Sequence, residues 1–505
     1  MVGVMSGMLL AALDQSIVGT ALPTITSELG GLDKLSWVVT AYLLTATAVT
    51  PLWGKISDLY GRRLIFQIAI SIFLVGSALC GFAQNIDQLI AFRALQGIGG
   101  GGLFSIALSI IGDVIPPRER GRYQGYFGAV FGASSVAGPL LGGFFTDGPG
   151  WRWIFYINLP IGIAALFITS AVLTMPVVKR EHKIDYPGAL AIVGGVTSLL
   201  LYLEWRGRDY GWTSPGALAL LAAFVLLTVA FVMIEQRASE PIIPMRLFRN
   251  GTYRVGNIFG FCAGVVMFGS IVFLPLYLQA VKGWSATESG LGMTPIVVGL
   301  LGSSIVAGNL MTKTGRYKVF PITGSVLMLI GLLLLTTLSV ATPYWQLALF
   351  MLVFGAGLGM TMQTLVTAIQ NDVPQRDMGT ATGSTTFFRQ MGGAIGTAAF
   401  GAVLGVRLSS YLADGLGDSA PAGSINTNDL AAIRELTGPV EAIVLRAFGD
   451  ALGDVFLVGI PFLVIALVAA VFLKEKPLQT GGGAPSREQG SREQGVAEEP
   501  VVASP

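Results

Sequence analysis

One short stretch of this chain occurs twice: residues 116–125 read PPRERGRYQG, and residues 374–383 read PQRDMGTATG. A proline, an arginine, an acid and two glycines keep their order and spacing, 258 residues apart. The repeat extends upstream, at the same offset for Gly97, Gly99 and Gly101 and at an offset of 254 for Gly54, Gly61 and Arg62. The chain therefore contains two copies of one unit.

Both copies lie in strongly apolar sequence. Hydrophobic residues make up 53% of the chain and charged residues 12%, about half the charged fraction of a typical soluble protein. Each apolar run is close to the ~20 residues that a helix needs to cross hydrocarbon, and alternating segments of the β-barrel type are absent. We predict an all-α integral membrane protein with fourteen spans, at about 2–23, 36–56, 64–83, 88–112, 122–145, 153–174, 187–205, 215–234, 254–280, 289–311, 318–339, 345–369, 380–404 and 452–473.

A duplicated helical unit in a bilayer is typical of secondary transporters, in which substrate binds between the two halves. The repeats pair span 2 with 10, span 4 with 12 and span 5 with 13, so spans 7 and 8 are an insertion between two six-helix units. We predict a first bundle at 1–175, inserted spans and a cytoplasmic linker at 176–252, a second bundle at 253–475 with an external loop at 405–451, and a disordered cytoplasmic tail at 476–505.

The basic residues indicate the orientation. With the N-terminus inside, 21 of the 31 Lys and Arg residues fall in cytoplasmic segments and eight on the opposite side, while Arg93 and Arg389 lie within spans. This asymmetry follows the positive-inside rule and predicts a multi-pass plasma-membrane protein with both termini in the cytoplasm. The first span has no signal-peptide cleavage site, and a short leader upstream of residue 1 is compatible with this topology.

Asp14 lies in the middle of the first span. A carboxylate there costs roughly 2.5–3.5 kcal/mol on insertion scales, and a low dielectric favours the neutral acid unless a cation is near. Such a group suits proton coupling, and the alternative is a helix-end aspartate that faces water. Arg93 in span 4 also needs a partner. We predict that it pairs with Asp14, the alternative being bonds to backbone carbonyls, and we favour a structural role for Arg389.

The segment between spans 2 and 3, residues 54–63, reads GKISDLYGRR. Its glycines allow close helix approach and chain reversal, and its acid and arginines can form ion pairs with each other or with an acid at the end of span 4. An ion pair made in one conformation only shifts the balance between states. We therefore predict a cytoplasmic latch formed by Gly54, Asp58, Gly61, Arg62, Arg63 and Asp113. The alternative, a tight positively charged loop, leaves the glycines and the acid unexplained.

Span 5 contains Gly125 and then residues 138–143, GPLLGG. Proline removes a backbone donor, and glycine permits bending and close packing. One interpretation is a hinge formed by Gly125, Gly138, Pro139, Gly142 and Gly143. The other is ordinary membrane-helix composition, because Gly and Pro are commoner there than in soluble helices.

The sequence does not support other kinds of site. Cys80 and Cys262 lie in separate apolar runs without disulfide or metal spacing, and the single histidine, His182, lies in a basic loop. There is no P-loop for a nucleotide and no nucleophile–base pair. We expect no metal, no cofactor, no nucleic-acid partner and no enzymatic activity.

These motifs together resemble those of the major facilitator superfamily. Residues 54–63 resemble its signature between spans 2 and 3, residues 93–101 its span 4 motif, and residues 138–143 its antiporter motif. The sequences LDQSIV at 13–18 and WRWIFYINLP at 151–160 are similar to the fourteen-span drug:proton antiporter family. The resemblance covers essentially residues 1–476.

The resemblance implies the major facilitator fold: two six-helix bundles in pseudo-symmetry plus two inserted helices. It also implies proton coupling through Asp14 and Arg93, with the latch and the hinge in the places described above. Three positions depart from the family pattern: Ser134 replaces a glycine of the antiporter motif, Gly19 replaces an asparagine of span 1, and Thr312 stands where the second half would match Asp58. These departures weaken the hinge and the second copy of the latch.

We therefore expect a monomeric exporter, in contact with membrane lipids, that exchanges amphipathic or cationic small molecules for protons by alternating access, driven by the proton gradient. Residues that can line its substrate cavity, each of which alone is more often packing, are Gln15, Tyr42, Tyr126, Asn257, Phe261 and Gln363. The alternatives are a dedicated exporter of one endogenous product, such as a lipid, siderophore or antibiotic, a nutrient:proton symporter, and a membrane receptor that transports nothing.

Overall fold

The apolar runs form long helices, because in hydrocarbon every backbone polar group has to be bonded within its own segment. The structure, a computed structural model, describes residues 2–29, 35–115, 117–172, 185–205, 214–416 and 438–477, and every regular element in these ranges is helical. Each of the fourteen predicted runs coincides with one helix or with two helices that meet at a single residue.

The first half comprises five long helices and a sixth that is broken at Ile157: α1 (Val2–Leu29), α2 (Leu35–Tyr60), α3 (Arg62–Phe82), α4 (Ile86–Val114), α5 (Pro117–Asp147), α6 (Trp153–Tyr156) and α7 (Asn158–Val172). Two inserted helices follow, α8 (Tyr186–Trp205) and α9 (Pro215–Glu235), and then the short 3-10 helix η2 (Met245–Arg249) in the linker.

The second half repeats this plan. Its elements are α10 (Gly251–Ala280), α11 (Ala286–Gly292), α12 (Thr294–Thr314), α13 (Val319–Leu335), α14 (Tyr344–Asp372), the 3-10 helix η3 (Gln375–Asp377), α15 (Met378–Leu416), α17 (Pro439–Leu457) and α18 (Gly459–Phe472). Here α11 and α12 are broken at Met293, and α17 and α18 at Val458.

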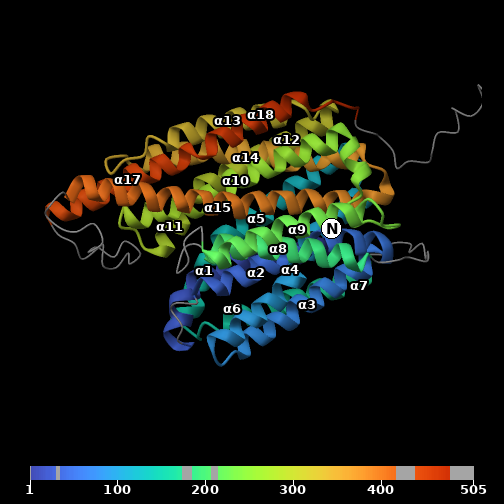
Figure 1. Ribbon diagram of the computed structural model, residues 1–505, viewed down its shortest axis with the longest axis horizontal. Helices are drawn as coiled ribbons and strands as arrows, with labels where there is room; N and C mark the ends of the chain where they lie inside the picture. Colours follow the sequence, from blue (N-terminus) through green and yellow to red (C-terminus); the bar gives the residue numbers. More distant parts are fainter. Residues whose placement is uncertain are drawn as a thin grey trace, which may run out of the picture.

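Equivalent helices pack against each other in both halves. In the first half α4 contacts α2 and α3, and α1 contacts α5 and α7; in the second, α14 contacts α12 and α13, and α10 contacts α15 and α18. The halves meet where α2 packs against α15 and α5 packs against α12. In Figure 1 the blue helices of the first half and the yellow-to-red helices of the second form two groups, and the green α8 and α9 lie across their contact, with α8 touching both α2 and α15.

Ten helical segments of the described chain are long and apolar enough to cross a membrane, which makes this a multi-pass membrane protein. Two further segments, Gly3–Gly19 and α13, are apolar but shorter. α2 and α5 are outside this set. Two threonines of α2 bond to backbone carbonyls, Thr45 to Ala94 O at 2.8 Å and Thr50 to Ala46 O at 2.6 Å. The count of fourteen spans therefore stays a prediction.

The segment predicted as an external loop, 405–451, is helical at both ends. α15 continues to Leu416, and α17 begins with Pro439 at its first turn, where proline is tolerated because that N–H has no helical acceptor. Residues 417–437 of this loop and residues 478–505 of the predicted tail lie outside the described ranges. Cys80 and Cys262 are free and buried in separate helices.

Candidate functional site

Asp14 is completely buried in the middle of α1, and donors from two other helices surround its carboxylate. Arg93 on α4 contacts Oδ2 through Nη1 at 2.6 Å, which is the predicted pair. Oδ1 accepts hydrogen bonds from Gln96 Nε2 at 2.8 Å and from Asn158 Nδ2 at 3.0 Å. The low dielectric of the bundle strengthens each of these bonds, and it makes the loss of any partner costly.

The α4 glycines explain why Arg93 reaches this position. Gly97 and Gly101 face the backbone of α2 at Tyr42 and Ala46, so closely that a Cβ at either position would collide with it. The two helices therefore pack backbone to backbone, and the guanidinium of Arg93 lies over the Tyr42 ring, 4.3 Å from its centroid. Its Nε also donates to Val38 O at 3.2 Å, which orients the guanidinium toward α1.

Sequence reasoning missed Gln96 and Asn158. Gln96 follows Arg93 by three residues, so both side chains lie on the same face of α4, and Arg93 Nη1 also donates to Gln96 Oε1 at 2.6 Å. Asn158 opens α7, inside the WRWIFYINLP motif, and its amide bridges Asp14 and Ser77 Oγ, the latter at 3.0 Å. The sequence signal for Asn158 was an amide side chain at the start of an apolar run. The sequence does not indicate which acid this amide contacts.

The charge balance of this cluster depends on the ionised form of Asp14. As a carboxylate, Asp14 balances Arg93 and accepts from two amides; once protonated, it no longer balances the guanidinium. Since an uncompensated buried charge is strongly unfavourable, a proton on Asp14 would force the cluster to rearrange or to admit another charged group.

A second cluster, the Asp58 cluster, joins the two halves at one end of the bundle. It consists of Asp58, Arg62 and Asp113 of the first half and the N-terminus of α15. Asp58 pairs with Arg62, whose Nε also contacts Asp113 Oδ2 at 2.7 Å. The Asp58 carboxylate then accepts from the backbone N–H groups of Gly379 at 2.9 Å and Thr380 at 2.7 Å. These groups are at the N-terminus of α15, where free N–H groups and the helix dipole favour an anion. The predicted pairing of Asp113 with one of the two arginines is thus present, with Arg62.

The other predicted latch residues have distinct places. Gly61 separates α2 from α3 with φ 93°, a conformation that favours glycine. Gly54 lies directly against the backbone of Gly379 and Gly383, which allows α2 and α15 to approach closely. Arg63 is outside the cluster, because its Nη2 donates to Ser170 O at 2.6 Å.

The second-half counterpart of this cluster is different. Thr312, at the position that matches Asp58, bonds within its own helix to Gly308 O at 2.9 Å. Asp377 is the second-half residue that corresponds to Glu119 in the repeat. Its carboxylate pairs with Arg246 of the linker at 2.8 Å. The ion pairs at this end are therefore asymmetric between the halves, in line with the departure noted at Thr312.

The predicted hinge residues lie along α5, which is a single uninterrupted helix. Gly138 faces Ser16 of α1 so closely that a Cβ would overlap the serine side chain, and Ser16 Oγ donates to Ser134 O at 2.8 Å. Gly142 is buried, and Gly143 is partly buried, with Thr287 Oγ1 4.0 Å from the position of an added Cβ. Gly125 and Pro139 lie within the helix, but their surroundings are outside the described part. Gly138 thus packs α5 against α1 one half-turn beyond Asp14.

Comparison with known proteins places these features in a family. The model of the Major Facilitator Superfamily matches residues 4–397. This chain belongs to the major facilitator superfamily. It is accordingly a transporter and not an enzyme, and it needs no cofactor.

The relatives of this facilitator cover almost its whole length. It is 39% identical over 498 residues to the multidrug transporter protein MdtP of Bacillus subtilis, covering 94% of this chain and 92% of the relative. Multidrug resistance protein 3 of the same organism is 37% identical over 488 residues, with 95% of each chain covered. Among solved structures, the proton:xylose symporter XylE shares the fold with a TM-score of 0.63 at 16% identity, covering 94% of this chain and 96% of that one.

The predicted cavity residues of this facilitator have different surroundings, and their assignment to one cavity stays a prediction. Tyr42 is buried beneath Arg93, whereas Tyr126 is 40% exposed and packs edge-on against Tyr123. Asn257 donates to Tyr253 O at 3.0 Å, and its Oδ1 has no partner among the described residues. Gln15 is partly buried and follows Asp14 in α1, and Phe261 is partly buried on α10. The side chain of Gln363 is outside the described part.

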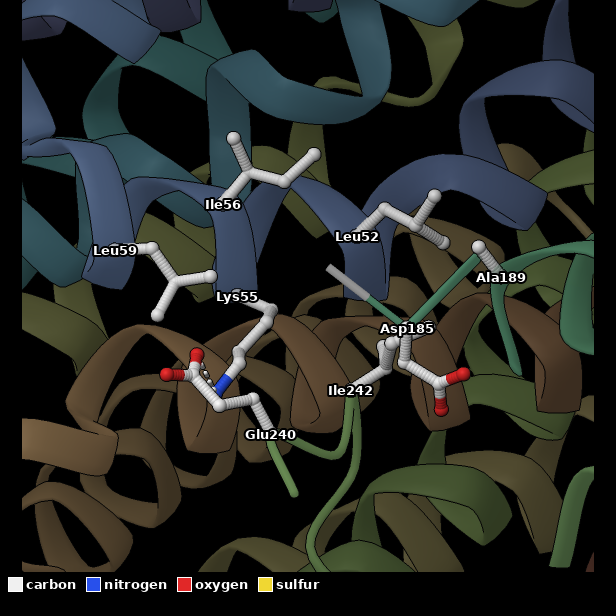
Figure 2. A pocket seen from close by; sticks show the side chains of 8 residues that line it. All are labelled: Leu52, Lys55, Ile56, Leu59, Asp185, Ala189, Glu240 and Ile242. Atoms are coloured by element: carbon white, nitrogen blue, oxygen red, sulfur yellow. Dashed lines mark ion pairs between the residues drawn. The ribbon is translucent and has the colours of Figure 1, made fainter. Parts of the chain in front are cut away.

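The cavity in Figure 2 is too small for a drug-sized substrate. Its volume is about 20 Å³, room for about one water molecule. It lies between α2 and the linker, where Lys55 pairs with Glu240 at 3.7 Å and Asp185 lies on the opposite side. The linker is held there because Glu235 accepts from the backbone N–H groups of Ile242 and Ile243 at 3.0 and 3.2 Å. The inserted helices are thus connected to α2 next to the Asp58 cluster.

Proposed function

We propose that this protein is a proton-coupled exporter of amphipathic or cationic small molecules, with fourteen spans and both termini in the cytoplasm. The buried Asp14 cluster is the observation that carries the proposal. An acid at this depth is costly, and here it is held by three donors in a part of the helix where no structural requirement for an acid is evident. The names of the relatives, a multidrug transporter and a multidrug resistance protein, support export as the direction.

In this proposal proton and substrate alternate at Asp14. The ionised carboxylate, held by Arg93, Gln96 and Asn158, belongs to the state that has released its proton. A proton arriving from outside neutralises Asp14 and leaves Arg93 without a counter-charge. The resulting electrostatic imbalance disfavours a bound cation and favours the conformation that returns the site to the cytoplasm.

The Asp58 cluster sets which side is closed. It joins α2 of one half to α15 of the other, so the substrate path is shut at that end while its bonds persist. With the proposed orientation this is the cytoplasmic end. Opening it requires the carboxylate to leave the N-terminus of α15, and the free energy of those bonds biases the exchange between states.

The test is transport in proteoliposomes under an imposed proton gradient, with a panel of lipophilic cations. We expect gradient-driven uptake by the wild-type protein and no gradient dependence for Asp14→Asn. Glu28→Gln is the matched control, because Glu28 lies on the same helix but at its far, exposed end. Gradient-driven transport by Asp14→Asn would contradict the assignment of the proton to Asp14. Failure of the wild-type protein with every cation would contradict the proposed substrate class.

A further inference from the structure

Arg389 lies at mid-depth in the bundle, where the two halves meet. It is eleven residues into α15, about 16 Å from the start of that helix at 1.5 Å per residue, against a hydrocarbon thickness of about 30 Å. Its backbone carbonyl packs against Gly264 of α10, and the next residue, Gln390, contacts Thr50 of α2 at 3.4 Å. Asp14 is twelve residues into α1, so the two charged residues lie at similar depths in opposite halves.

The side chain of Arg389 has no partner. Across the described ranges it makes no hydrogen bond, ion pair or ring contact, whereas Arg93 and Arg62 each contact a carboxylate. Residues 381–387 of α15 are buried, but residues 388–390 keep part of their surface accessible although they lie deep within the protein. Arg389 therefore keeps part of its surface accessible and has no partner among the described residues.

An unpaired cation at this depth is unfavourable for stability. A charged residue in the membrane interior is costly, and such residues occur mainly where they serve an ion or substrate pathway. A structural arginine would bond to carbonyls or to an acid, and Arg389 does neither. Since Asp14 and Arg93 neutralise each other, Arg389 leaves an uncompensated positive charge among the three residues.

We propose that Arg389 receives the anionic group of the transported molecule, so that the substrates include amphipathic organic anions. The fixed fork of a guanidinium matches carboxylate, sulfonate or phosphate oxygens. The proposal rests on the exporter function and makes its substrate class more specific.

The experiment compares two dyes that share a xanthene ring system but differ in charge, anionic fluorescein and cationic rhodamine 123. Equilibrium binding to the purified full-length protein is measured by fluorescence polarisation near neutral pH. We expect the wild-type protein to bind fluorescein more tightly than rhodamine 123. Arg389→Gln should weaken fluorescein binding about tenfold or more and leave rhodamine 123 unchanged or tighter, and Arg389→Lys should retain an intermediate affinity. The matched control is Arg407→Gln, on the same helix, where the arginine pairs with Asp454.

Thermal stability is a second measurement, because an unpaired arginine and a structural arginine predict opposite changes in melting temperature on substitution. Removal of an unpaired buried charge should raise the melting temperature of Arg389→Gln, whereas loss of a structural arginine would lower it. A lower melting temperature with equal loss of both dyes would overturn the proposal, as would a wild-type protein that binds neither dye or prefers rhodamine 123. Wild-type protein that binds fluorescein through Arg389 but moves no dye under a proton gradient would contradict the exporter function and support this inference.

Discussion

Two arginines within membrane-spanning helices, one in each half, have opposite surroundings. Arg93 is balanced by Asp14, bonded to Gln96 and Val38, and stacked on Tyr42. Arg389 has no such partner among the described residues. In a low dielectric this difference leaves Arg389 available to a ligand, whereas Arg93 is already balanced by the carboxylate of the proposed proton site.

Asn158 is expected to tune the proton site without carrying the proton. Its amide donates to Asp14 Oδ1, so Asn158→Ala removes one hydrogen bond to the carboxylate and favours the protonated acid. We expect the midpoint of the pH dependence of transport to move upward by about one unit, since a hydrogen bond to a charged group is worth about 1.5–3 kcal/mol.

The matched control for this substitution is Ser77→Ala. It removes the second partner of the Asn158 amide and leaves the contact with Asp14 in place. Its pH profile should stay close to that of the wild-type protein. Equal shifts in the two variants, or an unshifted profile in Asn158→Ala, would show that the amide acts only through packing.

Glu28 lies at the C-terminal end of α1. We expect it to contribute to stability in a pH-dependent way. Hydrogen bonds from Arg152 and Trp151 lower the pKa of its carboxyl below the usual value. A depressed folded-state pKa stabilises the fold above the unfolded value and loses that contribution as the pH falls through the folded value. The wild-type melting temperature should therefore exceed that of Glu28→Gln at neutral pH, although so exposed a pair contributes no more than about 1 kcal/mol to the free energy of unfolding. The difference should shrink as the pH falls below the unfolded value of about 4.3 and vanish below the lowered folded value. A difference independent of pH would exclude this cause.

At the scale of helices, glycine positions decide which elements can touch. Gly97 and Gly101 bring α2 to α4, Gly138 brings α1 to α5, and Gly54 brings α2 to α15. In a membrane, where lipid is as apolar as a side chain, such close backbone packing is a main source of helix association. The same pairings recur in the second half, which explains why the glycines repeat along the sequence at nearly the same offset.

Gly138→Ala should weaken the packing of α1 on α5. The added Cβ overlaps Ser16, and overpacking of this kind costs about 1–3 kcal/mol. We expect a lower melting temperature and slower transport. Gly19→Ala on α1 is the control, because nothing lies within 4 Å of its Cβ position and alanine favours helix by up to about 1 kcal/mol. A lower melting temperature for Gly19→Ala than for Gly138→Ala would contradict the packing argument.

At the scale of the whole molecule, the Asp58 cluster is one of the contacts that join the halves at one end, where Gln370 Nε2 also donates to Leu108 O at 3.1 Å. The bonds of the cluster to the start of α15 cross from one half to the other, whereas the pair of Asp372 with Lys476 at the same end lies within the second half. Contacts between the halves have to break when the halves separate there, and the pair within the second half does not. The Asp58 cluster is therefore expected to bias the conformational equilibrium, and the Asp372 pair is not.

Asp58→Asn should shift the population toward the state open at this end. Loss of the charge weakens the bonds to the α15 N-terminus, and a change of about 2 kcal/mol alters a two-state ratio roughly thirtyfold. The measurement is the distance distribution between spin labels at the exposed positions Leu64 and Val319, one in each half. Asp372→Asn is the control and should leave the distribution unchanged. The same distribution in Asp58→Asn and wild type would remove the latch role from Asp58.

Much of this molecule follows from its sequence alone. Helix identity, the internal repeat and membership of the superfamily follow from apolar run length and motif order, because in a bilayer the backbone has few structures to choose from. The pairing of Asp14 with Arg93 was also predictable, since two opposite charges in apolar spans have few other partners. The extension of α15 to Leu416 was not, because a polar helix outside the membrane has no run length to mark it.

Other features depend on tertiary packing. Gln96 and Asn158 reach Asp14 only because the glycines of α4 set the distance between helices, and Arg63 turns to Ser170 while its neighbour Arg62 enters the Asp58 cluster. The isolation of Arg389 is likewise invisible in the sequence, where its neighbours resemble those of Arg93. Whether a charge is paired depends on which side chains of other helices face it, and that is decided by helix rotation and spacing in three dimensions.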